Sequence, residues 1–173
     1  MTGPTIATAR LRLVPHTPSD LDEMTAVLGD PAVMGPIGVA PATREECWHR
    51  LLRYLGHWAT VGYGHWTARD LGTGRYLGEV GLMDSRRDTD PGFEGTPEVA
   101  WAFAPHAQGQ GLAAEACAAM LRWADDRGVA RTVAMIAPTN TPSIRLASRL
   151  GYDPAGEVAY LDRPALLFAR DRP

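Results

Sequence analysis

A glycine-rich loop at residues 108–113 is the part of the sequence best suited to binding an anion. It reads QGQGLA, follows a predicted strand and opens a predicted helix. Glycine lets the backbone approach a ligand closely, and the first turn of a helix offers unpaired N–H groups at the positive end of its dipole. Together these features suit a pyrophosphate. A simple helix-capping turn would show the same pattern, so the loop alone leaves both interpretations open.

The loop also comes close to the G-x-G-x-x-G pattern of dinucleotide-binding proteins, because residues 109–114 read GQGLAA. That pattern belongs to the first β–α turn of a parallel sheet and is followed by an acidic residue about 20 positions later. Here four predicted antiparallel strands precede the loop, and Asp125 and Asp126 lie too early, inside the same helix. We therefore disfavour dinucleotide binding.

Several other chemistries lack the residues they need. All 17 basic residues are arginine, which excludes a P-loop lysine and a Schiff-base lysine. Cys47 and Cys117 are too few for a disulfide framework and lack the neighbours of a catalytic thiol. The five histidines show no H-x-x-x-H spacing and the cysteines form no C-x-x-C pair, so we expect no metal.

Size and composition favour one domain spanning residues 1–173. The chain has 173 residues, 45% of them hydrophobic and 21% charged, with a net charge of -3, as in ordinary globular proteins. The absence of a basic excess argues against nucleic-acid binding. We expect no membrane span, because no apolar run reaches 18 residues, and no signal peptide. We therefore expect a cytoplasmic location.

The hydrophobic pattern also predicts the elements that position the loop. Alternation predicts a strand at 6–14, a hairpin at 65–71 and 75–83, and a strand at 98–104. Residues 30–42 are rich in Gly and Pro and are predicted to form a loop. Thr43 and Glu46 form a capping box. The apolar stripe predicted for the helix that follows is Trp48, Leu51, Leu52, Leu55 and Trp58.

The second half of the chain predicts a β–α–β unit. A helix at about 112–127 is followed by an apolar strand at 131–137, and such a crossover makes the two flanking strands parallel. Thr141 is the predicted N-cap of a last helix that runs to Leu150. A final hairpin is predicted at 157–161 and 164–169. The result is a mixed α/β domain with a largely antiparallel sheet.

At the glycine-rich loop the sequence resembles the GNAT superfamily of N-acetyltransferases. Gln108, Gly111 and Ala113 match the three specified positions of its Q/R-x-x-G-x-G/A signature. Further segments resemble the RimJ/RimL-type branch, which includes the ribosomal-protein alanine N-acetyltransferases, and they match in order and spacing from residue 8 to about 152. These segments are TARLRL at 8–13, DPAVM at 30–34, GEVGL at 78–82, EVAWAFAP at 98–105 and NTPSIRLASRLGY at 140–152.

The resemblance implies a GNAT-like α/β fold that binds acetyl-CoA as co-substrate. Such a fold has about seven strands flanked by about four helices, with the fourth and fifth strands, here 98–104 and 131–137, splayed apart. Pantetheine then pairs with the backbone of the fourth strand and the pyrophosphate takes N–H groups from the loop. The cofactor-binding residues implied are Val99, Ala100, Trp101, Ala102, Phe103, Gln108, Gly109, Gln110, Gly111, Leu112, Ala113, Ala114, Asn140 and Ser143.

The implied reaction is attack of a neutral amine on a thioester, which calls for a base. Glu98 matches a position where several relatives carry a catalytic carboxylate, and Glu79 is the second candidate. Alternatively, Glu98 lies in solvent or pairs with an arginine. Ser143 matches a serine proposed to assist the sulfur, or else it serves the helix start. Ala147 replaces the tyrosine that many relatives use as an acid, although a thiolate of ordinary pKa, about 8.5, leaves without one.

We therefore expect an acetyl-CoA-dependent N-acetyltransferase that acts on a primary amine. The acceptor is a protein N-terminus or a small-molecule amine. The sequence leaves the oligomeric state open, and many relatives form homodimers. The short final hairpin predicts an open acceptor side, and Trp66 is a lesser candidate for the acceptor pocket. The alternative function is an acyl-CoA sensor or a catalytically silent relative, which the missing tyrosine keeps open.

Overall fold

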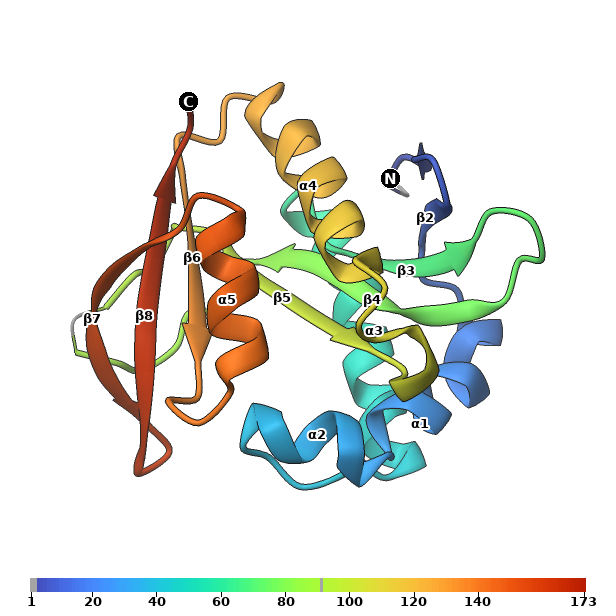
Figure 1. Ribbon diagram of the computed structural model, residues 1–173, viewed down its shortest axis with the longest axis horizontal. Helices are drawn as coiled ribbons and strands as arrows, with labels where there is room; N and C mark the ends of the chain where they lie inside the picture. The colour runs from blue at the N-terminus through green and yellow to red at the C-terminus, as the bar shows by residue number, and fades with distance from the viewer. Residues whose placement is uncertain (1–2, 91) are drawn as a thin grey trace.

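An eight-stranded sheet runs through the computed structural model, which describes residues 3–90 and 92–173 (Figure 1). Its strand order is β1-β2-β3-β4-β5-β6-β8-β7. Neighbours are antiparallel except β5 and β6, which confirms the parallel pair predicted from the β–α–β unit. The strands are β1 (Ile6–Ala7), β2 (Leu11–Pro15), β3 (His65–Asp70), β4 (Tyr76–Met83), β5 (Glu98–Phe103), β6 (Arg131–Ile136), β7 (Asp153–Tyr160) and β8 (Arg163–Asp171).

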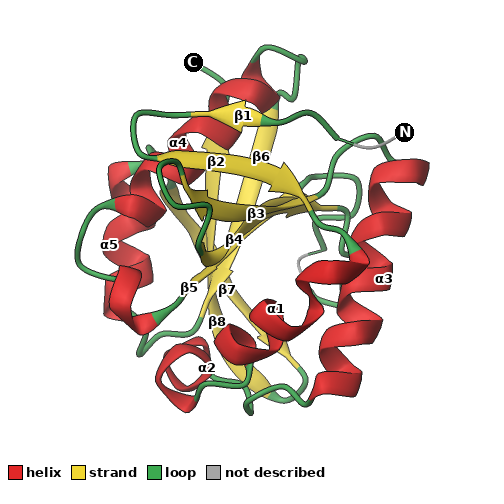
Figure 2. Cartoon of the chain, turned by 90° about the vertical axis from the view of Figure 1, so that its right-hand side faces the viewer, coloured by secondary structure: helices red, strands yellow, loops and turns green. Residues whose placement is uncertain are grey.

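Helices cover both faces of this sheet. Figure 2 shows α4 and α5 on one side and α1 and α3 on the other. The mixed α/β fold class is confirmed, with eight strands and five α-helices in the described residues where about seven and four were expected. The helical segments are η1 (Pro18–Asp20), α1 (Leu21–Leu28), α2 (Pro31–Ile37), α3 (Arg44–Thr60), η2 (Pro105–Ala107), α4 (Leu112–Asp125) and α5 (Thr141–Arg149).

Alternate side chains of β5 enter two different cores, as its sequence pattern predicts. Val99 and Phe103 pack in the core that contains the buried face of α4. Ala102 packs in the core formed with α1 and α3. Successive side chains of a strand point to opposite faces, so Glu98 belongs to the α1/α3 face and Trp101 to the α4/α5 face.

The prediction of a loop throughout residues 30–42 was wrong, because α2 lies within that range. Asp30 caps this helix: its side chain accepts a hydrogen bond from the N–H of Ala32 at 2.8 Å. Pro31 occupies the first turn, where a missing N–H costs nothing, and Gly38 ends the helix with a φ of 85°. Val33 and Met34 are buried in the core formed with α1 and α3. The density of Gly and Pro masked a capped helix of two turns.

The capping box of α3 is confirmed, but its buried face differs from the predicted stripe. The Thr43 hydroxyl accepts from the Glu46 N–H at 3.2 Å, and the Glu46 carboxylate accepts from the Thr43 N–H at 2.7 Å. Trp48 and Leu52 are 36% and 45% exposed. The buried residues are Cys47, Leu51, Tyr54, His57 and Trp58. The buried face of α3 includes Tyr54 and His57 because both side chains have hydrogen-bond partners inside the molecule. These hydrogen bonds compensate the cost of burying polar groups.

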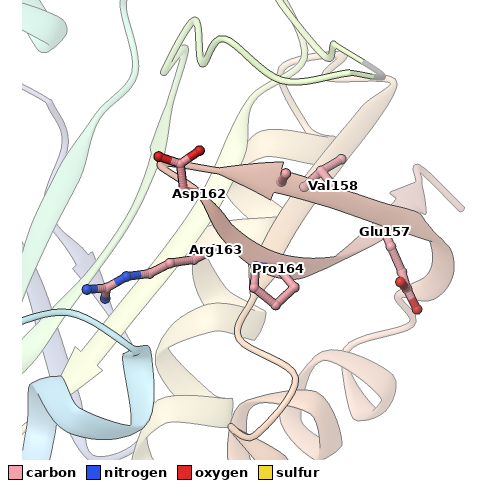
Figure 3. Close-up of a pocket in the computed structure, with 6 residues that line it drawn as sticks. Glu157, Val158, Asp162, Arg163 and Pro164 are labelled. Carbon is pink, nitrogen blue, oxygen red and sulfur yellow. The ribbon is translucent and has the colours of Figure 1, made fainter.

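The final hairpin is longer than predicted, so the expectation of a short hairpin was wrong. β7 and β8 have 8 and 9 residues, and Pro154 and Gly156 flank an irregularity in register rather than a break. An edge strand tolerates such residues. Arg163, at the end of the hairpin, donates to the carbonyl of Gly38, so the hairpin contacts the C-terminal end of α2 (Figure 3).

Candidate active site

β5 and β6 are paired at one position and diverge from it (Figure 1). Glu98 lies opposite Val133 in this parallel pair, whereas β5 keeps its register with β4 from Gly78 to Met83. Beyond Glu98, Ala100 is exposed and Trp101 is half-buried. The edge of β5 that faces β6 therefore carries backbone groups without a strand partner among the described residues, and these can pair with an extended ligand.

The glycine-rich loop has the backbone geometry predicted for an anion site. Gly109 and Gly111 have φ values of 73° and 76°, a region that L-residues other than glycine rarely adopt. Gly111 is the N-cap of α4, and the first bond of the helix runs from the N–H of Glu115 to the Gly111 carbonyl at 3.0 Å. The N–H groups of Leu112, Ala113 and Ala114 therefore have no acceptor inside the helix.

Two glutamine side chains hold the loop in shape. The Gln108 side-chain amide donates to the carbonyl of Phe103 at 2.9 Å, and the Gln110 amide donates to the carbonyl of His106 at 2.7 Å. Both glutamines are exposed. Their side chains thus fix the path from β5 to α4 and leave the backbone of the loop as the feature open to a ligand.

Glu98 is buried and paired with an arginine, one of the two alternatives left open by the sequence. Its carboxylate is held in a two-point contact with Arg87: Nε donates at 2.7 Å and Nη2 at 3.0 Å. Glu98 is 5% exposed, and the Arg87 guanidinium also lies over the ring of Tyr160 at 4.5 Å. The two-point contact fixes the carboxylate in direction. Its predicted catalytic role stays a prediction.

Glu79 lies at the centre of a buried polar cluster that the sequence did not reveal. The Tyr54 hydroxyl donates to its carboxylate at 2.7 Å and the Tyr76 hydroxyl at 3.4 Å. His16 Nε2 lies 3.5 Å and His65 Nδ1 4.0 Å from its oxygens. These partners come from four separated segments, and each alone resembles an ordinary core aromatic or strand-end histidine. Only the folded structure brings these four side chains around one carboxylate.

Protonation in this cluster is strongly shifted. Burial by itself favours the neutral acid, but the contact with His16 and the charges around it outweigh burial and lower the pKa of Glu79 to about 2. Burial lowers the pKa of the His65 imidazole to about 3, and it raises the pKa of the Tyr54 hydroxyl. At neutral pH the Glu79 carboxylate is thus an anion beside a neutral His65 ring and a neutral Tyr54 hydroxyl.

The start of α5 brings together three of the predicted cofactor residues. Asn140, not Thr141, is the N-cap: its side-chain oxygen accepts from the Ser143 N–H at 3.2 Å. The Ser143 hydroxyl accepts from the Trp101 indole N–H at 3.3 Å, so α5 is joined to β5 across the divergence of the strands. Ser143 therefore serves the helix start and also reaches β5, and its action on sulfur stays a prediction.

The predicted site residues divide between the two faces of the sheet. Trp101 and Ser143 meet on the α4/α5 face, whereas Glu98 lies on the α1/α3 face with Arg87 as its partner. Ala147 is fully buried, and the Tyr152 hydroxyl bonds to that of Thr132 at 2.6 Å inside the core. Neither side chain is placed to protonate a departing thiolate.

Trp66 does not line an open pocket, contrary to the minor role considered for it. It is fully buried and its indole N–H donates to the Pro4 carbonyl at 2.8 Å. Its ring packs edge-on against Trp58 and Trp123, with centroids 4.7 and 5.1 Å away. These contacts make Trp66 a core residue.

Two surface hollows lie away from the loop. One of about 490 Å³ follows the end of the β7–β8 hairpin and is lined by Glu157, Val158, Ala159, Asp162, Arg163 and Pro164 (Figure 3). The other, of about 390 Å³, lies beside α3 and is lined by Leu21, Arg44, Glu45 and Trp48.

In residues 3–90 and 92–173, no three metal-ligating side chains are grouped to hold an ion. No helix in these ranges is long and apolar enough to cross a membrane.

Comparison with known proteins identifies the family. The model of the Acetyltransferase (GNAT) domain matches residues 10–153. A GnaT-family structure from Bordetella pertussis is 37% identical, with a TM-score of 0.84 over 96% of this chain and 99% of that one. The uncharacterized Bacillus subtilis protein YkkB is 30% identical over 112 residues, and this match spans 63% of each protein.

A more distant structure contains coenzyme A. It is RimL, the ribosomal L7/L12 alpha-N-protein acetyltransferase in complex with coenzyme A, which is 16% identical with a TM-score of 0.76 over 97% of this chain and 98% of that one. At this identity the likeness is one of fold. Because the domain model covers most of the chain and the fold agrees throughout, the chain belongs to the GNAT acetyltransferase family.

Proposed function

We propose that this protein, as one domain, transfers an acetyl group from acetyl-CoA to a primary amine. One observation carries the proposal: β5 and β6 separate after a single paired position, and the loop that leaves β5 ends in a helix start with free N–H groups. An extended pantetheine arm fits the first feature and a pyrophosphate the second. The presence of coenzyme A in a structure of the same fold supports this assignment.

The reaction follows from the chemistry of a thioester. The amine lone pair attacks the acetyl carbonyl, so that a C–N bond forms and the C–S bond breaks, and the sulfur leaves with the electron pair as thiolate. One proton must leave the amine nitrogen. A backbone N–H of β5 stabilises the oxyanion as it forms. Sulfur leaves readily, because a thiol has an ordinary pKa of about 8.5.

Glu98 is our proposed base. It begins β5 at the position where β6 departs, and its bond to Arg87 holds the carboxylate in a fixed direction. Glu79 is the less suitable candidate, because two tyrosine hydroxyls and His16 surround its carboxylate and its pKa is lowered to about 2, which makes it a weak base. An ionised carboxylate accepts the amine proton directly or through a water molecule.

We propose that the acceptor enters beside α2 and the β7–β8 hairpin, which are joined by the bond from Arg163 to the Gly38 carbonyl. The acceptor class stays as the sequence left it, a protein N-terminal amine or a small-molecule amine. The hairpin is longer than expected and reaches α2, so its shortness no longer supports an open acceptor side.

A second candidate function is acyl-CoA binding without turnover. It is favoured by two observations: Ala147 fills the position of the missing tyrosine, and Ser143 is occupied by Trp101.

The test begins with calorimetric titration of the purified protein with acetyl-CoA, with NADH as control. We expect micromolar binding of acetyl-CoA and none of NADH. Release of free thiol is then followed with alanine- and serine-initiated peptides and with a panel of small amines. Binding with no turnover on any amine would support the sensor, and no binding at all would refute the cofactor assignment.

A further inference from the structure

Arg10 lies between β1 and β2, yet its side chain is fixed against the cofactor loop. Its Nε donates to Glu115 Oε2 at 2.7 Å and its Nη1 donates to the carbonyl of Gln110 at 2.9 Å. The Arg10 backbone N–H donates to Glu115 Oε1 at 2.8 Å, and the Thr8 hydroxyl donates to the same oxygen at 2.6 Å. A segment about 100 residues away in sequence thus holds the start of α4.

The bond to Gln110 determines where the next N–H points. In a trans peptide the carbonyl and the following N–H point in opposite directions. With the Gln110 carbonyl directed at Arg10, the N–H of Gly111 is directed away from it. The carbonyls of Phe103 and His106 are likewise held by side-chain amides. The N–H groups that follow those two carbonyls, from Ala104 and Ala107, donate to the carbonyls of Leu77 and Ala104. The bond from Arg10 to the Gln110 carbonyl is therefore the one that leaves a loop N–H, that of Gly111, to face an anion.

The same arginine also cancels an unfavourable charge. Glu115 lies in the first turn of α4, and although burial opposes ionisation, hydrogen bonds from Thr8 and Arg10 lower the pKa of its carboxyl. An uncompensated carboxylate there would repel a phosphate. Arg10 pairs with that charge while its side chain stays 49% exposed.

We propose that Arg10 is a positioning residue for phosphate binding, acting through the Gln110 carbonyl and not by touching the phosphate. This inference rests on the proposed function. It assigns the affinity for coenzyme A in part to a residue outside the loop that binds it. The expected signature is a loss of affinity for acetyl-CoA that leaves the acceptor KM unchanged.

The experiment separates positioning from charge. Calorimetry with acetyl-CoA is run on the wild type, on Arg10→Met, and on the charge-neutral double variant Arg10→Met/Glu115→Gln. We expect Kd to rise about tenfold in both variants, because both release the Gln110 carbonyl. Recovery of wild-type affinity in the double variant would overturn the inference, since Arg10 would then only neutralise Glu115.

The variant Arg10→Lys distinguishes positioning of the loop from a direct effect of the positive charge on the phosphate. A lysine keeps the charge but cannot hold Glu115 and the Gln110 carbonyl with one planar fork, so weakened binding is expected. Undiminished affinity in Arg10→Lys would show that the charge alone acts and would overturn positioning. Arg12→Met, an exposed arginine two residues further along, is the matched control, and circular dichroism checks the fold of each variant. If the wild type itself fails to bind acetyl-CoA, the proposed function fails and not this inference alone.

Discussion

Glu98 and Glu79 lie on the same face of the sheet but have different surroundings. Glu98 meets one guanidinium in a two-point contact at the point where the strands separate. Glu79 is enclosed by two tyrosine hydroxyls and two imidazoles. The first arrangement leaves further lone pairs of the carboxylate available, whereas the second uses them inside the core. These contacts motivate different predictions for the two residues.

Replacing Glu98 with glutamine tests its proposed role as base. We expect turnover at neutral pH to fall at least tenfold, about 1.4 kcal/mol of barrier, while the Kd for acetyl-CoA is unchanged. The measurement is kcat across pH together with calorimetric binding. Arg87→Met is the paired control: it removes the guanidinium but keeps the carboxylate. An unchanged kcat/KM for Glu98→Gln at every pH would remove Glu98 from the mechanism.

The buried histidine predicts a pH dependence of stability. The pKa of His65 is lowered to about 3 in the folded protein, against about 6.5 in an unfolded chain. Its neutral form therefore contributes stability that is complete above pH 6.5 and is lost as pH falls below that value. Glu79, with a folded pKa of about 2, adds a loss only below about pH 4.5.

Urea unfolding between pH 7.5 and 4.5 measures this effect. We expect a decline of up to roughly 1.4 kcal/mol per pH unit for one such group, and a flatter profile in His65→Gln. His106→Gln, which changes an exposed histidine, serves as control and keeps the wild-type slope. Equal slopes in the wild type and His65→Gln would contradict the assignment.

At the scale of elements, the glycines of the loop at residues 108–113 have a backbone conformation that other residues rarely adopt. Gly111 has a φ of 76° and caps α4, so a β-branched residue there must adopt a strained backbone or move the helix start. We predict that Gly111→Val weakens acetyl-CoA binding at least tenfold, whereas Gly111→Asn loses less because asparagine tolerates this region. Calorimetry measures both, and equal affinities in the two variants would refute the backbone argument.

Most elements with their own start and stop signals could be predicted from sequence; α2 also has such signals but was missed, because its density of Gly and Pro resembles that of a loop. The capping box at Thr43 and Glu46, the alternation in β5 and the glycines before α4 all act within a few residues, and each element formed where expected. The buried face of α3 could not be predicted, because Tyr54 and His57 are buried by partners far away in sequence. Polar residues buried through distant contacts carry no local periodic signal.

The candidate site shows the same division at the scale of the whole molecule. The glycine-rich loop could be singled out from its residue types and its place between a strand and a helix, whereas Asn140 was named through the family resemblance, and their binding roles stay predictions. The partner of Glu98 was left open because Arg87 lies in an irregular segment. Glu79 was named as the second candidate base, but the cluster around it and the contacts of Arg10 were not found, since these contacts join β1–β2, β3, β4, α3 and α4. Such contacts exist only after the sheet has assembled.

The contact between the β7–β8 hairpin and α2 yields a prediction at the same scale. Arg163 donates to the Gly38 carbonyl and so joins the two segments beside which we propose that the acceptor enters. Arg163→Ala releases this contact, and we expect the acceptor KM to change at least threefold while the KM for acetyl-CoA stays constant. Steady-state kinetics with both substrates varied measures this split. Arg131→Ala, an exposed arginine on β6, is the control, and a parallel change in both KM values would contradict the assignment.

The placement of the tryptophans has an optical consequence. Trp58, Trp66 and Trp123 are packed edge-on in one cluster, and Trp48 lies on the outer face of α3. Trp101 alone stands at the divergence of β5 and β6, bonded to α5. An intrinsic emission change on adding acetyl-CoA that disappears in Trp101→Phe therefore reports on that one contact, and the protein carries its own fluorophore for following cofactor entry in real time.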